Sequence, residues 1–430
     1  MDDVVIRYEN NQVILWSKKE KAYFCARNEK DNNEVKSVLM GNIDKGQIYE
    51  ELKKIGALAK RREIFSQNKD SLMAPLEYYF DFTNVCNLKC SHCYNRENMN
   101  MCTMADENIK NIITDMYENG VMRLHLAGGE PTLFPKQLNT YLETANKFGI
   151  VTSMASNGVC ITDEICNIIT KNNIMSITIS LESANEEKNA KIRGKGNLSK
   201  AIEGIKKLID YKEQNNSNYV VGIKVSYDVD TTEKEFEDLI KLAIKLKIGI
   251  LKFANPERCV FHPERYYSLV VNKYYRNIEI LKKLKEKYIN EILITVISSP
   301  VNNCKDIGLP NMSGCIGAQE LIAINPNGNI TPCLMNDYNL GNIYDYNSIS
   351  DVYKSESLKE YLKLIKNNSC DNCEYFRKCR GGCQVRKKVE YGKIQKEDPL
   401  CPVKNDIKWN KKNEYTDDNK LLKINVLHSL

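Results

Sequence analysis

The segment TNVCNLKCSHCYNREN, residues 83–98, contains three cysteines, Cys86, Cys90 and Cys93, at the spacing C-x3-C-x2-C. It follows LEYYFDFT, residues 76–83, whose apolar and aromatic residues predict a β-strand. Thiolates are soft ligands that suit iron–sulfur clusters or zinc. Three thiolates on one loop could hold a cluster and leave one iron open to a ligand from outside the protein. A zinc site completed by His92 or His125 is the alternative.

Five further strands follow the cysteine segment, and a helical pattern comes between each strand and the next. The strands are expected at 122–128, 150–156, 176–183, 219–229 and 249–256, and the helices at 105–120, 135–149, 162–173, 198–214 and 233–248. Repeated βα units predict a parallel sheet with helical crossovers. Six units are too few for a closed eightfold barrel, so we expect an α/β fold with a partial (β/α)6 TIM-like barrel over residues 76–300. In such folds the chemistry lies at the C-terminal ends of the strands.

The rest of the chain divides into three parts. Residues 1–75 predict a small α+β unit, with strands at 4–17 and 21–28 and helices at 32–41 and 45–62. Residues 301–403 are rich in Cys, Gly, Asn and Pro and have little regular pattern, so we expect a fold that depends on bound metal. Residues 404–430 form a polar tail whose last apolar stretch, LLKINVL, suits either a strand or a helix.

The composition restricts the class of protein. The chain of 430 residues has 62 basic and 56 acidic residues, a net charge of +6 that is too small and too evenly spread to indicate nucleic-acid binding. No window approaches the ~18–20 apolar residues of a membrane span, and the N-terminus has no signal-peptide pattern. In this setting 16 cysteines indicate metal or redox chemistry rather than disulfides. We therefore expect a cytoplasmic protein without nucleic-acid or membrane partners.

Glycines and polar residues follow the second, third and fourth predicted strands, at the same edge as the cysteine loop. They are Gly128, Gly129 and Glu130 after the second strand, Ser156 and Asn157 after the third, and Ser180 and Arg193 at and beyond the end of the fourth. Two glycines allow close approach of the backbone to a ligand, Glu130 can hold an amine, and Arg193 can pair with a carboxylate. Together with an open iron, these residues predict an amino-acid site.

In this order, the motifs CNLKCSHC, GGEP, SNG and SLES resemble those of the radical S-adenosylmethionine (radical SAM) superfamily. The resemblance implies a [4Fe–4S] cluster on Cys86, Cys90 and Cys93, whose open iron binds S-adenosylmethionine and whose electron generates a 5′-deoxyadenosyl radical. It assigns the amino group of S-adenosylmethionine to Gly128, Gly129 and Glu130, and its carboxylate and ribose to Ser180 and Arg193, with Ser156 and Asn157 as further contacts. His92 stands where the family often has an aromatic residue, and there it implies mainly a backbone contact to adenine.

Seven later cysteines follow the pattern C-x12-G-x4-C … C-x2-C-x5-C-x3-C … C, with Gly328 as its glycine. The C-x2-C-x5-C part alone could belong to a zinc ribbon, but the whole string resembles the SPASM extension of radical enzymes. That resemblance implies two auxiliary [4Fe–4S] clusters, a distal one on Cys370, Cys373, Cys379 and Cys401 and a proximal one on Cys315, Cys333 and Cys383. Cys304 would close the proximal cluster. Its separation of eleven residues from Cys315 is long for that family, which leaves an open proximal cluster as the alternative.

The resemblance also implies a substrate class, because SPASM enzymes mostly modify peptides. Residues 1–75 resemble the PqqD-like, winged-helix-like recognition element of enzymes that mature ribosomally made peptides (RiPPs), where a leader peptide pairs with a strand edge. We therefore expect a precursor peptide as partner, with its leader bound by this domain, and a reducing partner such as flavodoxin or ferredoxin. A simple packing appendage is the alternative.

Formation of a thioether crosslink is the leading hypothesis for the reaction. Carbon–carbon or carbon–oxygen closure competes with it, as does epimerisation with Cys259 as the hydrogen donor, although a buried structural thiol is the plainer interpretation of Cys259. Sulfatase maturases resemble the chain but carry an acidic base directly after the cysteine that matches Cys333, where this sequence has Leu334. A quinone-cofactor maturase is a further alternative. An iron–sulfur electron carrier is the non-enzymatic one, although a carrier would not need GGEP, SNG and Arg193.

Overall fold

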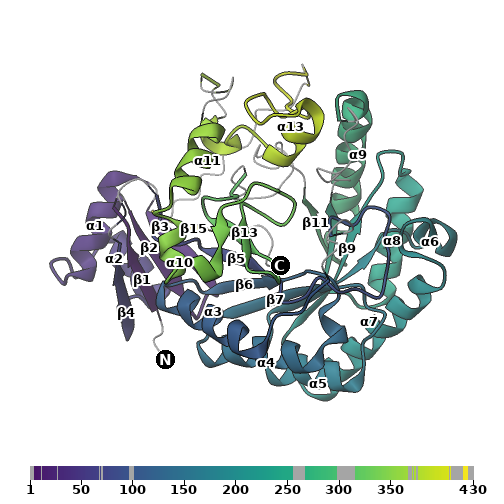
Figure 1. Ribbon diagram of the computed structural model, residues 1–430, viewed down its shortest axis with the longest axis horizontal. Coiled ribbons are helices and arrows are strands. Elements are labelled where there is room, and N and C mark those ends of the chain that lie inside the picture. Colours follow the sequence, from purple (N-terminus) through teal and green to yellow (C-terminus); the bar gives the residue numbers. More distant parts are fainter. Residues whose placement is uncertain are drawn as a thin grey trace.

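The chain forms two sheets, as the computed structural model shows (Figure 1). The residues that it describes are 4–10, 12–26, 28–66, 68, 71–95, 101–254, 267–297, 315–366, 370, 372–373, 376–405, 407 and 420–424. The larger sheet has ten strands in the order β11-β10-β9-β8-β7-β6-β5-β12-β13-β14, and the smaller has five in the order β15-β3-β2-β1-β4.

Seven parallel strands of the larger sheet make the partial barrel, which confirms the predicted fold class. They are β5 (Glu77–Phe80), β6 (Arg123–Leu126), β7 (Val151–Ser156), β8 (Ser176–Leu181), β9 (Val220–Ser226), β10 (Ile250–Ala254) and β11 (Leu293–Ile297). The last of them was not among the six expected strands. It extends the sheet beyond β10, and the barrel stays open because β11 is one end of the strand order.

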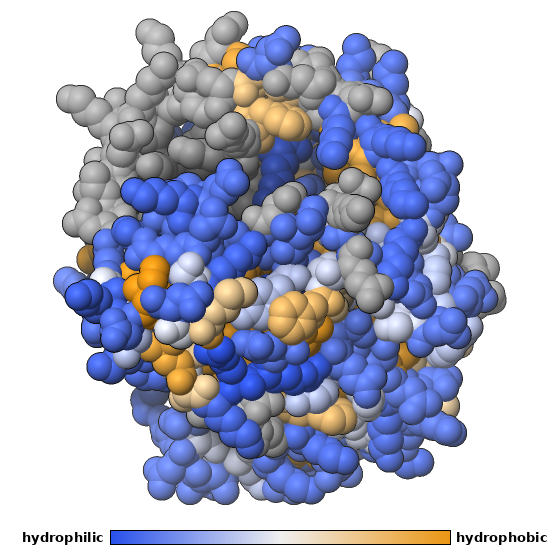
Figure 2. All heavy atoms as spheres, turned by 90° about the vertical axis from the view of Figure 1, so that its left-hand side faces the viewer, coloured by the Kyte–Doolittle hydropathy of each residue, from blue (hydrophilic) through white to orange (hydrophobic). Residues whose placement is uncertain are grey.

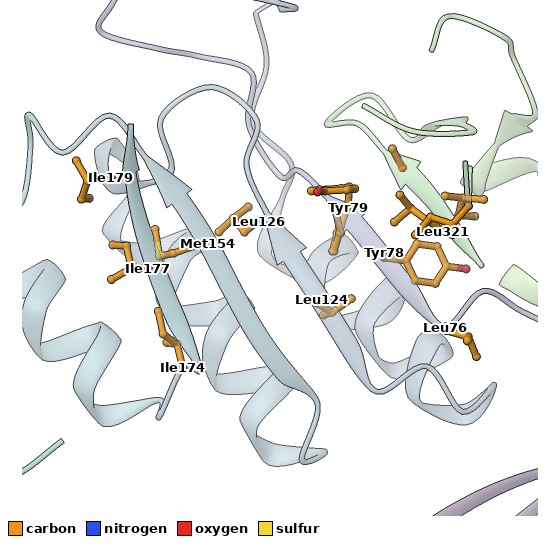
Figure 3. Close-up of a cluster of buried hydrophobic side chains, with 14 of the residues drawn as sticks. Leu76, Tyr78, Tyr79, Leu124, Leu126, Met154, Ile174, Ile177, Ile179 and Leu321 are labelled. Carbon is orange, nitrogen blue, oxygen red and sulfur yellow. The ribbon is translucent and has the colours of Figure 1, made fainter. Parts of the chain in front are cut away.

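Helices cover the outer face of these strands (Figure 1). They are α3 (Asp106–Glu118), α4 (Pro135–Lys147), α5 (Asp163–Lys171), α6 (Glu186–Arg193), α7 (Asn197–Gln214), α8 (Glu233–Lys245) and α9 (Tyr267–Lys287), with the 3-10 turn η1 (Pro131–Leu133) before α4. Each strand buries alternate side chains against them, as Leu124, Leu126 and Met154 show in Figure 3. As expected, a glycine follows the C-terminal end of α3: Gly120 comes directly after the C-cap residue Asn119, and its φ of +73° lies in the left-handed region that favours glycine.

The C-terminal part of the chain extends the barrel sheet by one parallel strand. Strand β12 (Leu321–Ile324) pairs in parallel with β5, and β13 (Asn329–Thr331) and β14 (Gly341–Asn342) continue the sheet in antiparallel fashion. The helical elements that follow are η4 (Ile343–Asp345), α10 (Ile349–Val352), α11 (Glu356–Lys366), α12 (Phe376–Cys379) and α13 (Gln384–Tyr391). Strand β5 therefore lies between the barrel and the cysteine-rich region.

The N-terminal unit differs in two places from its prediction. The expected single strand over 4–17 is a hairpin of β1 (Val4–Tyr8) and β2 (Val13–Ser17), and the Glu9 N–H donates to the Gln12 carbonyl at 2.9 Å where the two strands meet. The end of the second expected helix is a strand, β4 (Arg61–Phe65), which pairs in parallel with β1. The remaining elements are β3 (Ala22–Ala26), α1 (Glu29–Leu39) and α2 (Gln47–Lys54), and the two helices pack together over the sheet.

The end of the chain returns to this N-terminal sheet. Residues Leu421–Ile424 form β15, which pairs antiparallel with β3, so the tail docks here as a strand and not as a helix. Within the described ranges, no helix is both long enough and apolar enough to cross a membrane.

Candidate active site at the mouth of the barrel

The loop that carries Cys86, Cys90 and Cys93 leaves the end of β5 and lies directly against the glycines that follow β6. A Cβ on Gly129 would lie 2.1 Å from the Val85 carbonyl oxygen, and one on Gly128 would lie 2.3 Å from the Thr83 carbonyl oxygen. Two backbone hydrogen bonds hold this approach, from Gly129 N to Thr83 O at 2.9 Å and from Glu130 N to Val85 O at 2.8 Å. The two glycines therefore allow the backbone of the cysteine loop to come close. From the sequence we had expected them to allow the close approach of a ligand.

Hydrogen-bond donors surround two of the sulfurs in this loop. The Leu88 N–H lies 3.4 Å from Cys86 Sγ, and Asn157 Nδ2 lies 3.9 Å from the same atom. Arg193 Nη1 lies 3.9 Å from Cys90 Sγ. Burial raises the pKa of both thiols, and these donors and the guanidinium act against that shift. The pKa of each thiol stays above its usual value, so a bound metal would have to stabilise the thiolates, with these donors in support.

Glu130 is completely buried and its carboxylate is shared among neighbours in the protein. Oε1 accepts from Ser156 Oγ at 2.8 Å and from Thr132 Oγ1 at 2.7 Å, and Oε2 accepts from Asn157 N at 2.7 Å. Burial raises the pKa of this carboxyl, and these donors oppose the shift. Asn157 Nδ2 also donates to Asn87 Oδ1 in the cysteine loop at 2.7 Å. The structure thus joins the GGEP and SNG motifs and ties both to the cysteine loop.

Arg193, which we expected to bind a carboxylate, is paired within the protein. Its Nε and Nη2 donate to Glu182 Oε1 at 2.9 and 2.6 Å, and the side chain of Glu182 is 2% exposed. His92 Nε2 lies 3.5 Å from the same oxygen, and the Ser226 N–H donates to Glu182 Oε2 at 3.0 Å. Burial lowers the pKa of His92, although Glu182 opposes that shift. The Glu182 carboxylate therefore orients the Arg193 guanidinium at the end of α6 and the His92 imidazole in the cysteine loop. It also binds the backbone at the end of β9.

Three other polar groups complete the mouth of the barrel. Ser180 is half-buried, and its hydroxyl has no hydrogen bond within the part of the chain that the structure describes. Asp81 accepts from the Ala127 N–H at 2.8 Å, and burial raises its pKa to about 7. Tyr94, directly after Cys93, donates its hydroxyl to the Gly128 carbonyl at 3.5 Å. Asp81 and Tyr94 thus fix the chain on both sides of the cysteine loop.

The C-terminal cysteines fall into two neighbourhoods. Burial raises the pKa of the Tyr361 phenol, and the thiols of Cys315, Cys333 and Cys383 raise it further. The Asn336 side chain donates to the Tyr361 hydroxyl at 2.9 Å. Three cysteines from three separate segments therefore lie around one buried tyrosine.

The second neighbourhood contains Cys370, Cys373 and Cys401. Burial raises the pKa of Cys370 to about 11, and the thiols of Cys373 and Cys401 also raise it. The Cys373 N–H donates to the Cys370 carbonyl at 2.9 Å. Cys379 ends α12, and the Gly382 N–H donates to its carbonyl at 3.0 Å.

A buried ion pair joins the two neighbourhoods. Arg386 Nη2 donates to Asp398 Oδ2 at 2.8 Å, and both side chains are 1% exposed. The same carboxylate accepts from the Cys383 N–H at 2.7 Å, and the Cys401 N–H donates to the Asp398 carbonyl at 2.9 Å. A Cβ on Gly382 would lie 2.4 Å from Asp398, so this close packing requires glycine. Asp398 thus fixes one cysteine of each neighbourhood.

The arrangement of the thiols bears on the choice between zinc and iron–sulfur clusters. Within the described ranges, no three His, Cys, Asp or Glu side chains lie close enough together to hold a single metal ion. His125 bonds to Ser153 Oγ at 2.8 Å inside the barrel, and His92 lies on Glu182. Both histidines that could have completed a zinc site are thus bound to other side chains. Cys259 and Cys304 lie outside the described residues.

Three functional residues were missed from the sequence. Glu182 stands inside the SLES motif, where a carboxylate at a strand end was a usable signal beside Ser180. Asp81 gave the same signal at the end of β5. Asp398 gave none, because its partners Cys383 and Arg386 lie more than ten residues away, at the start of α13.

Comparisons with known protein families agree with this geometry. Residues 80–243 match the radical SAM superfamily, and residues 315–380 match the iron–sulfur cluster-binding domain called SPASM. The chain therefore belongs to the radical SAM enzymes that carry a SPASM domain, within the group that includes peptide maturases. Its cofactors are accordingly S-adenosylmethionine and iron–sulfur clusters.

Relatives of known role are similar along most of the chain. The mycofactocin maturase MftC of Mycobacterium tuberculosis is 25% identical over 79% of this chain and 85% of its own length. The subtilosin biosynthesis protein AlbA of Bacillus subtilis is 24% identical over 77% of this chain and 72% of its own. The crystal structure of Streptococcus suis SuiB bound to the precursor peptide SuiA superimposes with a TM-score of 0.70 at 17% identity, covering 93% of this chain and 98% of that one.

Proposed function

We propose that this protein modifies a ribosomally made precursor peptide and installs a crosslink, most simply a thioether. The domains that would do this are a recognition element at 1–75, the radical SAM barrel at 76–300, a SPASM domain at 301–403 and the tail at 404–430. The observation that carries the proposal is the position of β5, which borders both the cysteine loop and the SPASM cysteines. Burial raises the pKa of Tyr79 on this strand, and both Cys333 and Tyr94 raise it further.

The residues at the barrel mouth fit the expected cofactors. Cys86, Cys90 and Cys93 would hold the first cluster, and the unbonded Ser180 hydroxyl with Arg193 would hold the carboxylate and ribose of S-adenosylmethionine. Gly128 and Gly129 would offer backbone groups to its amino group, with Glu130, Ser156 and Asn157 holding that backbone in place. When bound, S-adenosylmethionine and the clusters would supply a 5′-deoxyadenosyl radical and an acceptor for the electron released on ring closure.

The SPASM cysteines are assigned to two auxiliary clusters on the same basis. Cys315, Cys333 and Cys383, around Tyr361, would hold the proximal cluster, with Cys304 as its fourth ligand. Cys370, Cys373, Cys379 and Cys401 would hold the distal one, and the electrostatic contact among Cys370, Cys373 and Cys401 supports this grouping. In a thioether reaction the peptide would lose one hydrogen atom from carbon, one proton from the thiol and one electron to such a cluster.

The partners follow from the architecture and the relatives. SuiB has been crystallised with a precursor peptide, and AlbA is a biosynthesis protein of the bacteriocin subtilosin, which supports a peptide substrate here. The small N-terminal sheet offers strand edges at which a leader could pair. The first cluster needs an electron from a donor such as flavodoxin or ferredoxin, and clusters of low potential suit a reducing cytoplasm.

Sulfatase maturation is disfavoured by the segment after Cys333. Leu334 occupies the position at which we expect the acidic base of those enzymes. The nearest carboxylate along the chain, Asp337, is paired with Lys388, whose Nζ lies 2.7 Å from its Oδ2. This carboxylate is therefore already engaged by a lysine side chain.

The first test is the formation of 5′-deoxyadenosine. The anaerobically reconstituted and reduced enzyme is incubated with S-adenosylmethionine, and products are separated by chromatography. The proposal requires 5′-deoxyadenosine and about twelve irons per chain if all three clusters are full. An iron–sulfur carrier would contain the iron but yield no 5′-deoxyadenosine.

The second test identifies the bond. A short cysteine-containing peptide encoded beside this chain is incubated with the reduced enzyme, alkylated with iodoacetamide and weighed. A thioether predicts a loss of two mass units together with the loss of one alkylated thiol. A loss of two mass units with every thiol still alkylated indicates carbon–carbon or carbon–oxygen closure, and an unchanged mass indicates epimerisation or no reaction.

A further inference from the structure

One edge of the N-terminal sheet is occupied by the chain's own C-terminal segment. Strand β15 pairs antiparallel with β3 over four residues, with Leu421 opposite Ala26 and Ile424 opposite Tyr23 (Figure 1). Without this segment β3 would be an edge strand, with unpaired backbone groups that can pair with another chain. The tail therefore covers a surface suited to strand addition.

Glu51 on α2 receives the start of this segment. Its Oε1 accepts from the Lys420 N–H at 2.9 Å, and its Oε2 accepts from the Leu421 N–H at 2.7 Å. The Leu421 side chain is 5% exposed and belongs to the core between the sheet and the two helices. One carboxylate and one apolar pocket thus fix the position of the strand along β3.

The charges around the groove are complementary to those of the segment. Lys420 Nζ lies 3.2 Å from Glu34 Oε2 and 3.8 Å from Asp31 Oδ1, both on α1. Lys423 Nζ lies 3.5 Å from Glu20 Oε2, just before β3. The groove therefore selects an extended segment in which a basic residue precedes a buried apolar one.

We propose that residues 420–424 are a built-in substitute for a leader peptide, which the leader of the substrate displaces when it pairs with β3. This inference rests on the proposed function and deepens it, because it predicts the chemistry of the leader. The leader should offer an extended segment with a basic residue directly before an apolar one. In the absence of substrate, the tail would keep the edge of β3 closed.

The bonds that hold the tail suit such an exchange. The paired segment is four residues long, and Lys420 and Lys423 keep 33% and 42% of their side-chain surface exposed. Exposed ion pairs contribute little, so the strand depends on its backbone pairing and on Leu421. A tethered segment competes at an effective concentration of roughly millimolar, which a leader of higher intrinsic affinity can overcome. The face of the molecule that carries the N-terminal unit is largely hydrophilic, with separate hydrophobic patches (Figure 2).

The experiment measures access to the β3 edge. The probe is a fluorescent peptide with the sequence of residues 418–427, DNKLLKINVL, and its binding is followed by anisotropy under anaerobic conditions. The reconstituted full-length enzyme is compared with a variant that ends at residue 407 and with full-length Leu421→Asp, which keeps the whole chain. Both variants should bind the probe about tenfold more tightly than the unaltered full-length enzyme does.

A matched pair of substitutions locates the site. In the shortened enzyme, Glu51→Gln should weaken probe binding about tenfold, because it removes a charged acceptor of two backbone N–H groups. Glu63→Gln on β4, at the opposite edge of the sheet, should leave it unchanged. Two results would overturn the proposal. One is equal affinity for the probe in the unaltered enzyme, the shortened enzyme and Leu421→Asp. The other is a loss of probe affinity with Glu63→Gln and none with Glu51→Gln.

The result is separable from the proposed function. Formation of 5′-deoxyadenosine without peptide is measured in the same preparations, and it depends on the barrel mouth and not on the tail. Its absence in the full-length enzyme would reject the radical chemistry while leaving the binding result valid. Conversely, normal 5′-deoxyadenosine formation with no effect of tail removal would reject only the role of the tail.

Discussion

The cysteine loop of the barrel and the cysteines of the SPASM domain are held in different ways. Cys86, Cys90 and Cys93 stand within eight residues on one loop, which short backbone contacts fix against the glycines after β6. The described SPASM cysteines come from separate segments between residues 315 and 401, and Asp398 links two of those segments. The first site is thus prepared by the packing of the barrel, whereas the second depends on polar contacts between segments distant in the sequence.

This difference predicts that the two regions fail separately. A defect in the loop should stop radical formation and leave the SPASM region folded. A defect among the SPASM cysteines should lower stability and stop product formation, while radical formation in the absence of peptide continues. Each substitution below tests one side of that division.

The largest effect is expected from Cys90→Ala. Removal of one of the three thiolates should lower the rate of 5′-deoxyadenosine formation more than about 100-fold. Changes to residues that only contact a metal ligand already cost ~10–100-fold in metal affinity or activity. The measurement is the rate of 5′-deoxyadenosine formation in the absence of peptide, together with iron content. Cys373→Ala is the matched control, and it should lose about four irons while keeping that rate. Equal rates in the two variants would contradict the assignment of both sites.

The next effect concerns Asp398→Asn. This change removes the negative charge that pairs with the buried guanidinium of Arg386. We expect it to lower the free energy of unfolding by about 3–5 kcal/mol. The expected result is a lower melting temperature, loss of iron and loss of peptide product, with radical formation in the absence of peptide retained. Asp337→Asn, the same change at a surface pair, should cost less than about 1 kcal/mol. Similar melting temperatures for the two variants would show that Asp398 does not link the segments.

Gly129→Ala tests how the cysteine loop is held. Its Cβ would stand 2.1 Å from the Val85 carbonyl oxygen, so the loop must move away from β6. We expect loss of iron from the first cluster and at least a tenfold lower rate of 5′-deoxyadenosine formation, as for other changes that misplace metal ligands by about 1 Å. Gly249→Ala, just before β10 and at the opposite end of the strands, is the control, because its φ also lies outside the left-handed region and its new Cβ would meet only the Val220 side chain, at 2.9 Å, and the Val221 carbonyl oxygen, at 3.6 Å. A cluster fully retained in Gly129→Ala would refute the packing argument.

The sequence predicted these two sites unequally, for a physical reason. The cysteine loop, GGEP, SNG and SLES lie at successive strand ends, and parallel strands bring their ends to one edge, so their proximity could be inferred. Tertiary partners could not be inferred in the same way. Glu182 and Arg193 are joined by a turn and a helix, and β15 pairs with β3 across nearly four hundred residues. The extra strand β11 was missed because its apolar run is short and gives no clear distinction between strand and buried helix.

Glu182→Gln gives the smallest effect, and it separates cofactor binding from cluster binding. The substitution keeps the shape of the side chain but removes the charge that orients Arg193 and His92. Because Arg193 would then be held less firmly beside Cys90, we expect the KM for S-adenosylmethionine to rise about tenfold, with a smaller change in kcat. Iron content should stay unchanged, since the three cysteines and the glycine contacts are intact. Glu213→Gln, at an exposed pair with Lys247, should change neither quantity. If iron is lost together with the affinity, Glu182 supports the cysteine loop itself, and the division between cofactor and cluster residues at the barrel mouth must be redrawn.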